Sequence, residues 1–146
     1  MIDPGNLALV LVLCAALSIL SYRFGLLSGS GAAASFAVGA IIGILGSIGW
    51  LVTLLAFTFL GFFVTKFRFR AKKRLHVQEG IRGERTHKNV LANGMIPAAV
   101  AIVSFALGQQ GSEIAGLAFI SSVAVAAADT TASELGVLSK RVYLIT

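Results

Sequence analysis

The residues best suited to chemistry lie near the C-terminal end of the sequence, where an apolar run meets a polar motif. The run, from 114 to 128, predicts a membrane helix, and two carboxylates and three hydroxyls follow it within six residues, among them Asp129, Thr130, Ser133 and Glu134. A carboxylate at the edge of hydrocarbon is costly unless it has a partner, so it is a functional candidate. On a helix, Asp129 and Ser133 share one face, and Thr130 and Glu134 share the adjacent face. We therefore expect the motif to surround a cation or a phosphate.

A second polar segment, before the last two apolar runs, is rich in basic side chains. Its candidate phosphate-binding residues are Arg82, Arg85, Lys88, Asn89 and Asn93. Glycines 80 and 83 would let the backbone approach an anion closely. The segment leads into a predicted helix N-terminus, where free N–H groups and the helix dipole favour phosphate. Lys140, which follows the acidic motif, completes the set of candidate phosphate ligands.

Together the two segments favour metal-assisted phosphoryl transfer. Mg²⁺ prefers one or two carboxylates plus substrate phosphates, so Asp129 and Glu134 are predicted as its ligands and as catalytic residues. Cations of the basic loop would neutralise charge on the transferred phosphoryl group. The structural alternative is that both acids pair with Arg82 or Lys140 and only hold helices together. In that reading Asn89 only caps a helix.

Composition predicts an integral membrane protein with an all-α fold. Of 146 residues, 57% are hydrophobic and only 12% are charged, whereas about a quarter are charged in a typical soluble domain. We predict a single transmembrane domain over residues 1–146, a polytopic helix bundle of about five spans with a basic loop between spans three and four. The spans are expected near residues 7–22, 33–45, 50–65, 89–107 and 114–135. A loop is expected over 25–31, and the third helix is expected to continue toward Leu75.

The formal net charge of +6 is concentrated in one loop. Nine of the twelve Lys and Arg residues lie between Lys66 and Lys88. The positive-inside rule then places this loop and the acidic motif on the cytoplasmic side and the N terminus outside. A basic loop at a membrane face indicates an anionic partner, either membrane lipid or phosphate. Since no nucleic-acid-binding module is recognisable, no nucleic-acid partner is predicted.

Two stretches, RTHKNVLANGMIPA and ADTTASELGVLSKRVYLIT, resemble the signature segments of an integral-membrane family. That family includes the plant phytyl-phosphate kinase of tocopherol synthesis and an uncharacterised animal transmembrane protein. By motif the resemblance covers residues 65–146, and the earlier spans match in pattern only. It implies an isoprenoid monophosphate kinase that uses Mg²⁺ and either CTP or ATP. Carried over by position, the polar site residues would be Asn89, Asn93, Asp129, Thr130, Ser133 and Glu134.

The resemblance also predicts how much of the family architecture this chain covers. Family members continue past the Leu-Ile-Thr that ends this sequence at Thr146. We therefore expect the chain to correspond to the N-terminal part of a longer architecture. It would act with a C-terminal partner subunit or as a homo-oligomer.

Two other functional classes stay open from the sequence. In a transporter or channel subunit, Asp129 would line an ion or metabolite path, and neutralising it would abolish flux. In a non-catalytic lipid-binding subunit, the basic loop would grip anionic lipid and the acids would only pair helices. Neutralising Asp129 would then destabilise the protein without changing any turnover.

Overall fold

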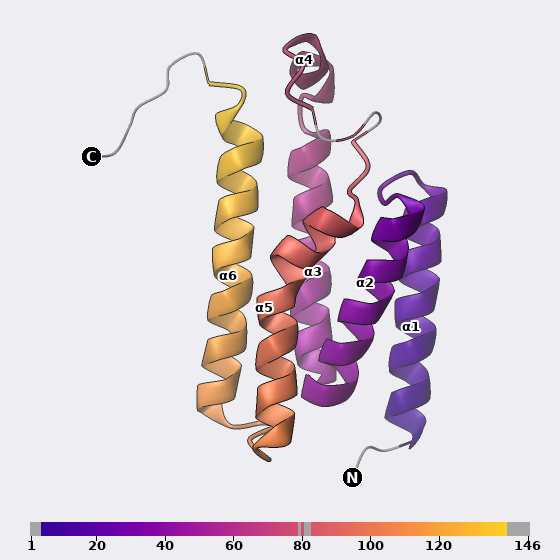
Figure 1. Cartoon of the computed structure of the whole chain (residues 1–146), viewed down its shortest axis with the longest axis vertical. Coiled ribbons are helices and arrows are strands. Elements are labelled where there is room, and N and C mark those ends of the chain that lie inside the picture. The colour runs from indigo at the N-terminus through magenta and orange to yellow at the C-terminus, as the bar shows by residue number, and fades with distance from the viewer. Residues whose placement is uncertain (1–3, 79, 81–82, 140–146) are drawn as a thin grey trace, which may run out of the picture.

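A computed structural model describes residues 4–78, 80 and 83–139 of the chain (Figure 1). Within these residues the fold is all-helical, as predicted. The elements in order are α1 (Pro4–Arg23), α2 (Gly29–Ile41), the π-helical turn η1 (Ile42–Gly46), α3 (Ile48–Lys66), α4 (Phe69–Arg74), α5 (His87–Ala106) and α6 (Glu113–Gly136). Five helical segments are long and apolar enough to cross a membrane, with α2 and η1 forming one of them. The prediction of about five spans is confirmed.

The five long segments stand side by side, with α1 and α6 at opposite edges (Figure 1). The strongest packing joins α2 with α5, α1 with α2, α3 with α6 and α5 with α6. The main core draws on four of these helices: Val38, Ile42, Leu54, Phe57, Ala98, Ala101, Phe119 and Val123. Near the end of the bundle opposite α4, Trp50 stacks on Phe119 with ring centroids 4.4 Å apart. This contact fixes α3 against α6.

Close helix approach in the bundle depends on glycine at a few positions. A Cβ at Gly94 of α5 would lie 2.8 Å from a methyl group of Val38 on α2, too close for any side chain. A Cβ at Gly43 in η1 would lie 2.6 Å from a methyl group of Val10 on α1. Small residues at such crossings are typical of membrane helix packing. They allow η1 to approach α1 and α5 to approach α2 closely.

Two expected boundaries are wrong. The loop expected over 25–31 is shorter, because Ser28 caps α2 by accepting a hydrogen bond from the Gly31 amide at 3.1 Å, so helix begins at Gly29. The third helix does not continue toward Leu75 but ends at Lys66. Phe67 is extended and Arg68 has a φ of 49°, so the chain reverses into the separate short helix α4.

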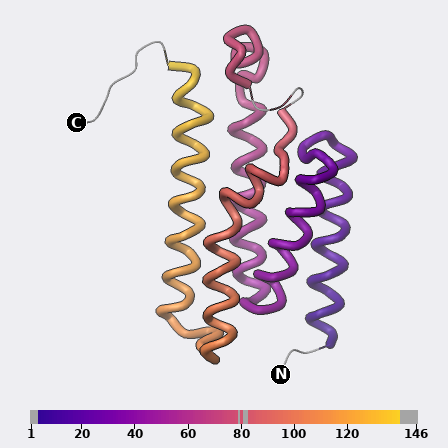
Figure 2. Tube along the Cα trace, in the orientation of Figure 1, coloured from indigo at the N-terminus to yellow at the C-terminus, as the bar shows by residue number. Residues whose placement is uncertain are grey.

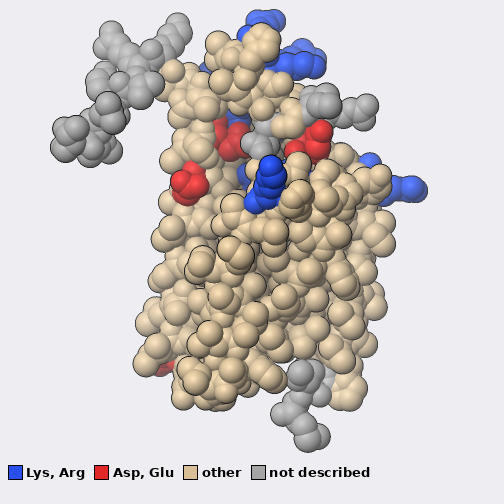
Figure 3. All heavy atoms as spheres, viewed as in Figure 1, with Lys and Arg blue, Asp and Glu red and all other residues tan. Residues whose placement is uncertain are grey.

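Charged side chains gather at the end of the bundle that carries α4 (Figure 3). The Cα trace shows that α1 begins at the opposite end and α6 finishes at the charged end (Figure 2). Large apolar residues are exposed along the sides of the bundle, for example Phe63, Val52 and Val125. An exposed apolar belt below a charged end is the surface expected of a protein in a bilayer.

Candidate functional site

Arg85 is held in place through its backbone by the loop between α1 and α2. The Ser28 amide donates to the Arg85 carbonyl at 3.0 Å, and the Arg85 amide donates to the Leu26 carbonyl at 3.0 Å. A Cβ at Gly31 would lie 2.4 Å from that same carbonyl oxygen, so glycine is required there. These contacts fix the second half of the basic loop beside the start of α2.

The Arg85 side chain points into the bundle toward α3. It is buried, and its Nη2 donates to Thr65 Oγ1 at 3.1 Å. A Cβ at Gly61 would lie 2.6 Å from Arg85 Nη1, so the absence of a side chain there makes room for the guanidinium. A permanent positive charge is thereby placed inside the helix bundle.

Glu134 closes a polar network at this level. Its Oε1 accepts from Thr65 Oγ1 at 2.6 Å, and its Oε2 lies 2.6 Å from Lys72 Nζ. Arg85 Nη2 is 4.0 Å from Oε1. Lys72 has no exposed surface, and its Nζ also donates to the Val64 carbonyl at 2.8 Å. Lysine in this position donates to a free carbonyl at the C-terminal end of α3 and places a positive charge at the negative end of that helix dipole. Its ion pair with Glu134 also links α4 to α6.

This network agrees in kind with the structural alternative for Glu134, and the partner that the structure describes is Lys72. The expected partners, Arg82 and Lys140, lie outside the described residues. Sequence reasoning missed both Lys72 and Thr65. Lys72 is one of several basic residues in an unbroken run, and nothing in its neighbours distinguishes it. Its role follows only from the chain reversal at Arg68.

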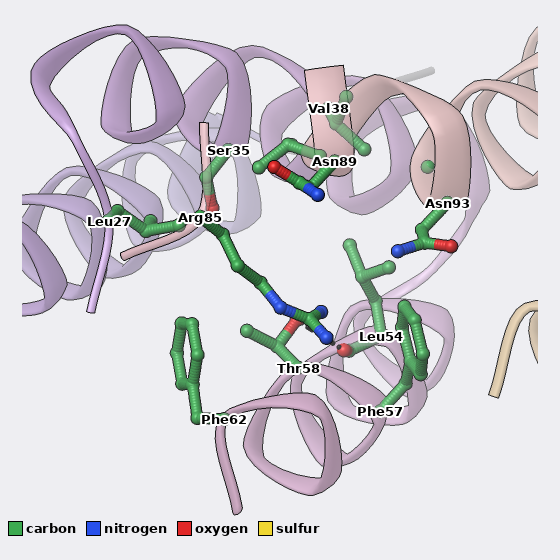
Figure 4. A pocket seen from close by; sticks show the side chains of 12 residues that line it. Leu27, Ser35, Val38, Leu54, Phe57, Thr58, Phe62, Arg85, Asn89 and Asn93 are labelled. Atoms are coloured by element: carbon green, nitrogen blue, oxygen red, sulfur yellow. Dashed lines mark hydrogen bonds between the residues drawn. The ribbon is translucent and has the colours of Figure 1, made fainter. Parts of the chain in front are cut away.

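Asn89 and Asn93 lie one turn apart at the start of α5. Asn89 Oδ1 accepts from the Thr86 amide and from Thr86 Oγ1, both at 3.0 Å, as in a capping box. Asn93 Oδ1 accepts from Thr130 Oγ1 at 3.5 Å. With both oxygens turned to these partners, the two amide nitrogens face the same space as the Arg85 guanidinium (Figure 4).

That space is a cavity of about 50 Å³ between α2, α3 and α5. Its polar lining comes from Ser35, Thr58, Arg85, Asn89 and Asn93, and the rest is apolar. A volume of that size holds several water-sized groups. Because the arginine and both amide nitrogens donate hydrogen bonds, the cavity suits a small oxygen-rich or anionic group. We call it the donor cavity.

The acidic motif divides between two surfaces of α6. Thr130 is buried and Glu134 faces the bundle, whereas Asp129 and Ser133 are exposed. Ser133 bonds only locally, to the Thr130 carbonyl at 3.1 Å. Among the described residues, Asp129 makes no hydrogen bond or ion pair. The two adjacent faces that helical spacing predicts are present, but the face with Thr130 and Glu134 points into the bundle, and the face with Asp129 and Ser133 points outward.

The remaining candidates do not join one cluster. Lys88 is exposed at the first turn of α5, and Arg82 and Lys140 fall outside the described part of the chain. Within that part, no group of three or more His, Cys, Asp or Glu side chains could hold a metal. Both Glu134 oxygens are engaged by Lys72 and Thr65. Of the two predicted metal ligands, Asp129 is the carboxylate with its oxygens open.

Comparison with known proteins places the chain in a membrane-protein context. The model of the family described as integral membrane protein DUF92 matches residues 12–146. An uncharacterized membrane protein of Methanocaldococcus jannaschii is 35% identical over 130 residues, which cover 89% of this chain and 51% of that protein. The chain thus spans about half the length of the curated relative it matches. No solved structure matches it.

Proposed function

Because the chain belongs to the DUF92 family of integral membrane proteins, we propose that it binds an isoprenoid monophosphate and takes part in its phosphorylation to the diphosphate. The observation that carries this proposal is the donor cavity. Arg85, Asn89 and Asn93 direct hydrogen-bond donors into one space at the charged end of an apolar bundle (Figure 4). A phosphate on an apolar chain is the type of ligand that needs both surroundings.

The electrostatics of the cavity favour phosphate over a neutral headgroup. Arginine forms strong, directional hydrogen bonds with phosphate oxygens. The Glu134 carboxylate would repel an anion, but Lys72 lies 2.6 Å from it and compensates its charge. Arg85 is therefore the charged group that a ligand in the cavity would meet.

In the proposed reaction, an oxygen of the bound monophosphate attacks the terminal phosphorus of CTP or ATP. A new P–O bond forms as the bond from that phosphorus to the β-phosphate oxygen breaks, and the nucleoside diphosphate leaves. The protein contributes positioning and charge neutralisation, which are the main requirements of phosphoryl transfer. Lys88, which is exposed in the first turn of α5, would meet the nucleotide's phosphates.

Mg²⁺ would neutralise charge on the nucleotide phosphates when bound. Such an ion commonly takes one or two protein carboxylates and completes its shell with phosphates and water. Asp129 fits this role, since its carboxylate is exposed and makes no hydrogen bond within the described residues. Glu134 fits it poorly, because a buried lysine and a threonine engage its oxygens. We assign Glu134 to the support of Arg85.

The proposal treats this chain as the part that binds the isoprenoid phosphate. Since the chain spans about half of its curated relative, the nucleotide site is proposed to be completed by a C-terminal partner subunit, a covalent extension or a second copy. The outer face of α6, which bears Asp129, is the surface where such residues would join.

The test is a transfer assay in nanodiscs with Mg²⁺. Phytyl or geranylgeranyl monophosphate is incubated with CTP or ATP labelled at the terminal phosphate, with and without the C-terminal half of the relative. We expect labelled diphosphate from one of these mixtures and a loss of at least about a hundredfold for Arg85→Gln and Asp129→Asn, since removing one transition-state interaction typically costs that much. Absence of diphosphate from every mixture would contradict the kinase proposal.

A further inference from the structure

A second cavity, of about 190 Å³, lies between α1, α2 and α3. Its walls are mainly apolar, with Leu17, Leu51, Leu55 and Phe62 among them, and Cys14 lies at one side. It is smaller than the roughly 300–1,000 Å³ typical of pockets that enclose a drug-sized ligand. It therefore has room for part of one hydrocarbon chain. We call it the apolar cavity.

The apolar cavity adjoins the donor cavity directly. Ser35, Leu54, Thr58 and Phe62 line both of them. These residues form a neck. On one side of it lie the Arg85 guanidinium and two asparagine amides (Figure 4), and on the other side lie the hydrocarbon walls of the apolar cavity. A molecule that spans the neck would have an anionic head and a single apolar chain.

The apolar cavity also reaches the surface that faces lipid. Leu20, Phe24 and Phe59 line it and are 52%, 71% and 63% exposed. α1 packs mainly against α2, and it meets α3 in one small cluster in which Val10 and Cys14 pack with Leu51. Beyond that cluster, the gap between α1 and α3 forms a side opening of the apolar cavity beside these exposed residues.

We propose that this gap is a lateral portal through which a single-chain anionic amphiphile enters from the bilayer. Its chain lies in the apolar cavity, and its head passes the neck at Ser35 and Thr58 to meet Arg85. The identity of the chain as an isoprenoid rests on the proposed function. The route itself rests on the two adjoining cavities and the exposed Phe24 and Phe59.

The first test uses Cys14, the single cysteine of the chain, as a reporter inside the apolar cavity. Its labelling by N-ethylmaleimide is followed in nanodiscs without nucleotide. Geranylgeranyl monophosphate at ten times its Kd should slow labelling about tenfold, because roughly one tenth of the sites stay open. Geranylgeraniol, which lacks the phosphate, and phosphatidic acid, which has two chains, should protect far less. Equal protection by phosphatidic acid would assign the site to membrane lipid and overturn the proposal.

A matched pair of substitutions tests the neck. Thr58 and Thr53 lie on the same helix, are partly buried, and each donates to the carbonyl four residues earlier, at 2.8 Å and 2.9 Å. Only Thr58 lines the cavities. Thr58→Leu should abolish protection of Cys14 by geranylgeranyl monophosphate, and Thr53→Leu should preserve it. Unchanged protection in folded Thr58→Leu would contradict the route.

If Cys14 reacts too slowly to follow, photocrosslinking can map the position of the ligand's hydrocarbon chain directly. A geranylgeranyl monophosphate analogue with a diazirine at the chain end should crosslink within residues 17–24, at the end of α1 and just after it, or within residues 51–62 of α3. Crosslinks confined to the outer face of α6 would overturn the proposal. Crosslinks at the expected helices without any phosphoryl transfer would retain the portal and remove the kinase. Phosphoryl transfer with crosslinks elsewhere would retain the kinase and remove the portal.

Discussion

At the scale of single residues, the buried lysine opposite Glu134 is the feature on which the polar end of the bundle depends. Lys72 is fully buried and meets a carboxylate and two backbone carbonyls, those of Val64 and Thr65. Removing one member of a buried pair leaves an uncompensated charge, which costs more than the pair itself contributes. The pair therefore predicts an asymmetric response to mutation.

Lys72→Met should destabilise the protein by about 3 kcal/mol, at the lower end of the range for a broken buried ion pair. The lower end is expected because the Glu134 side chain keeps 12% of its surface exposed, so some water reaches it. The measurement is equilibrium unfolding in mixed detergent and SDS micelles. Lys73→Met, at the exposed neighbouring position, is the control and should change stability by less than about 0.5 kcal/mol.

The double variant Lys72→Met with Glu134→Gln completes a thermodynamic cycle. Both charges are then gone, so we expect stability to recover by more than half of the single loss. If the double variant were less stable than Lys72→Met by the full cost of Glu134→Gln, the two residues would be uncoupled and the ion pair would have no structural role.

A glycine next to Arg85 gives a second prediction at this scale. Gly61→Ala would place a methyl group 2.6 Å from Arg85 Nη1 and displace the guanidinium. Gly49→Ala, on the same helix, would meet only Ser47 Oγ at 3.6 Å. Both changes replace a helical glycine by alanine, and this replacement by itself stabilises a helix by up to about 1 kcal/mol.

The two alanine variants should therefore differ in ligand binding more than in helix stability. We expect Gly61→Ala to weaken binding of geranylgeranyl monophosphate at least about tenfold, the equivalent of 1.4 kcal/mol. Gly49→Ala should bind as wild type does. The readout is the ligand-induced shift in melting temperature. An unchanged shift in Gly61→Ala would show that Arg85 does not contact the ligand.

The types and spacing of residues in the sequence predicted several members of the candidate site, but they did not predict which residues contact one another. Asn89, Asn93 and Thr130 were predictable because helical spacing alone sets their faces. Lys72 was not predictable, because its partner comes from a segment 62 residues away and depends on a left-handed residue at Arg68. Six basic residues between 66 and 74 look alike in sequence, and only tertiary packing selects one for burial.

At the scale of elements, the first turn of α5 combines a structural and a binding role. Asn89 caps the helix through Thr86 and also lines the donor cavity, whereas Asn93 lines the cavity and makes one long hydrogen bond to Thr130. Substitutions at these two positions should therefore separate the roles.

Asn89→Ala should cost about 1 kcal/mol of stability, since it removes a capping acceptor. Asn93→Ala should cost less than about 0.5 kcal/mol, because its bond is long and weak. Both should reduce the melting-temperature shift caused by geranylgeranyl monophosphate. Asn89→Asp is the informative companion, because it retains the acceptor while placing a negative charge against the phosphate. Asn89→Asp with full ligand binding would exclude a phosphate beside this turn.

The wrong boundary at the end of the third helix has a tertiary cause. The apolar and basic pattern through 48–75 is compatible with one long helix, and helical propensity alone gives no reason to stop. The chain reverses after Lys66 because Lys72 can then satisfy carbonyls at the end of α3 while pairing with Glu134. Local sequence does not encode that gain, since half of the interaction belongs to α6.

At the scale of the whole molecule, the five-span count and the charged end together predict an orientation in the membrane. The pattern of apolar runs was enough to predict the number of spans, because hydrocarbon thickness sets their length. How the helices pack was not predictable, since it depends on glycine contacts such as Gly94 with Val38. Sidedness stays a prediction: by the positive-inside rule, we expect the end bearing α4 to face the cytoplasm.

This orientation predicts opposite labelling for the two ends of the bundle. In a Cys14→Ala background, Lys73→Cys reports on α4, and Gln109→Cys reports on the turn between α5 and α6. Both positions are exposed. In inverted bacterial membrane vesicles, a membrane-impermeant maleimide should label Lys73→Cys at once and Gln109→Cys only after detergent is added. Right-side-out vesicles should give the reverse. Labelling of both positions from one side would contradict the five-span topology, and the inverse pattern would place Arg85 and the donor cavity on the outer face, away from cytoplasmic nucleotide.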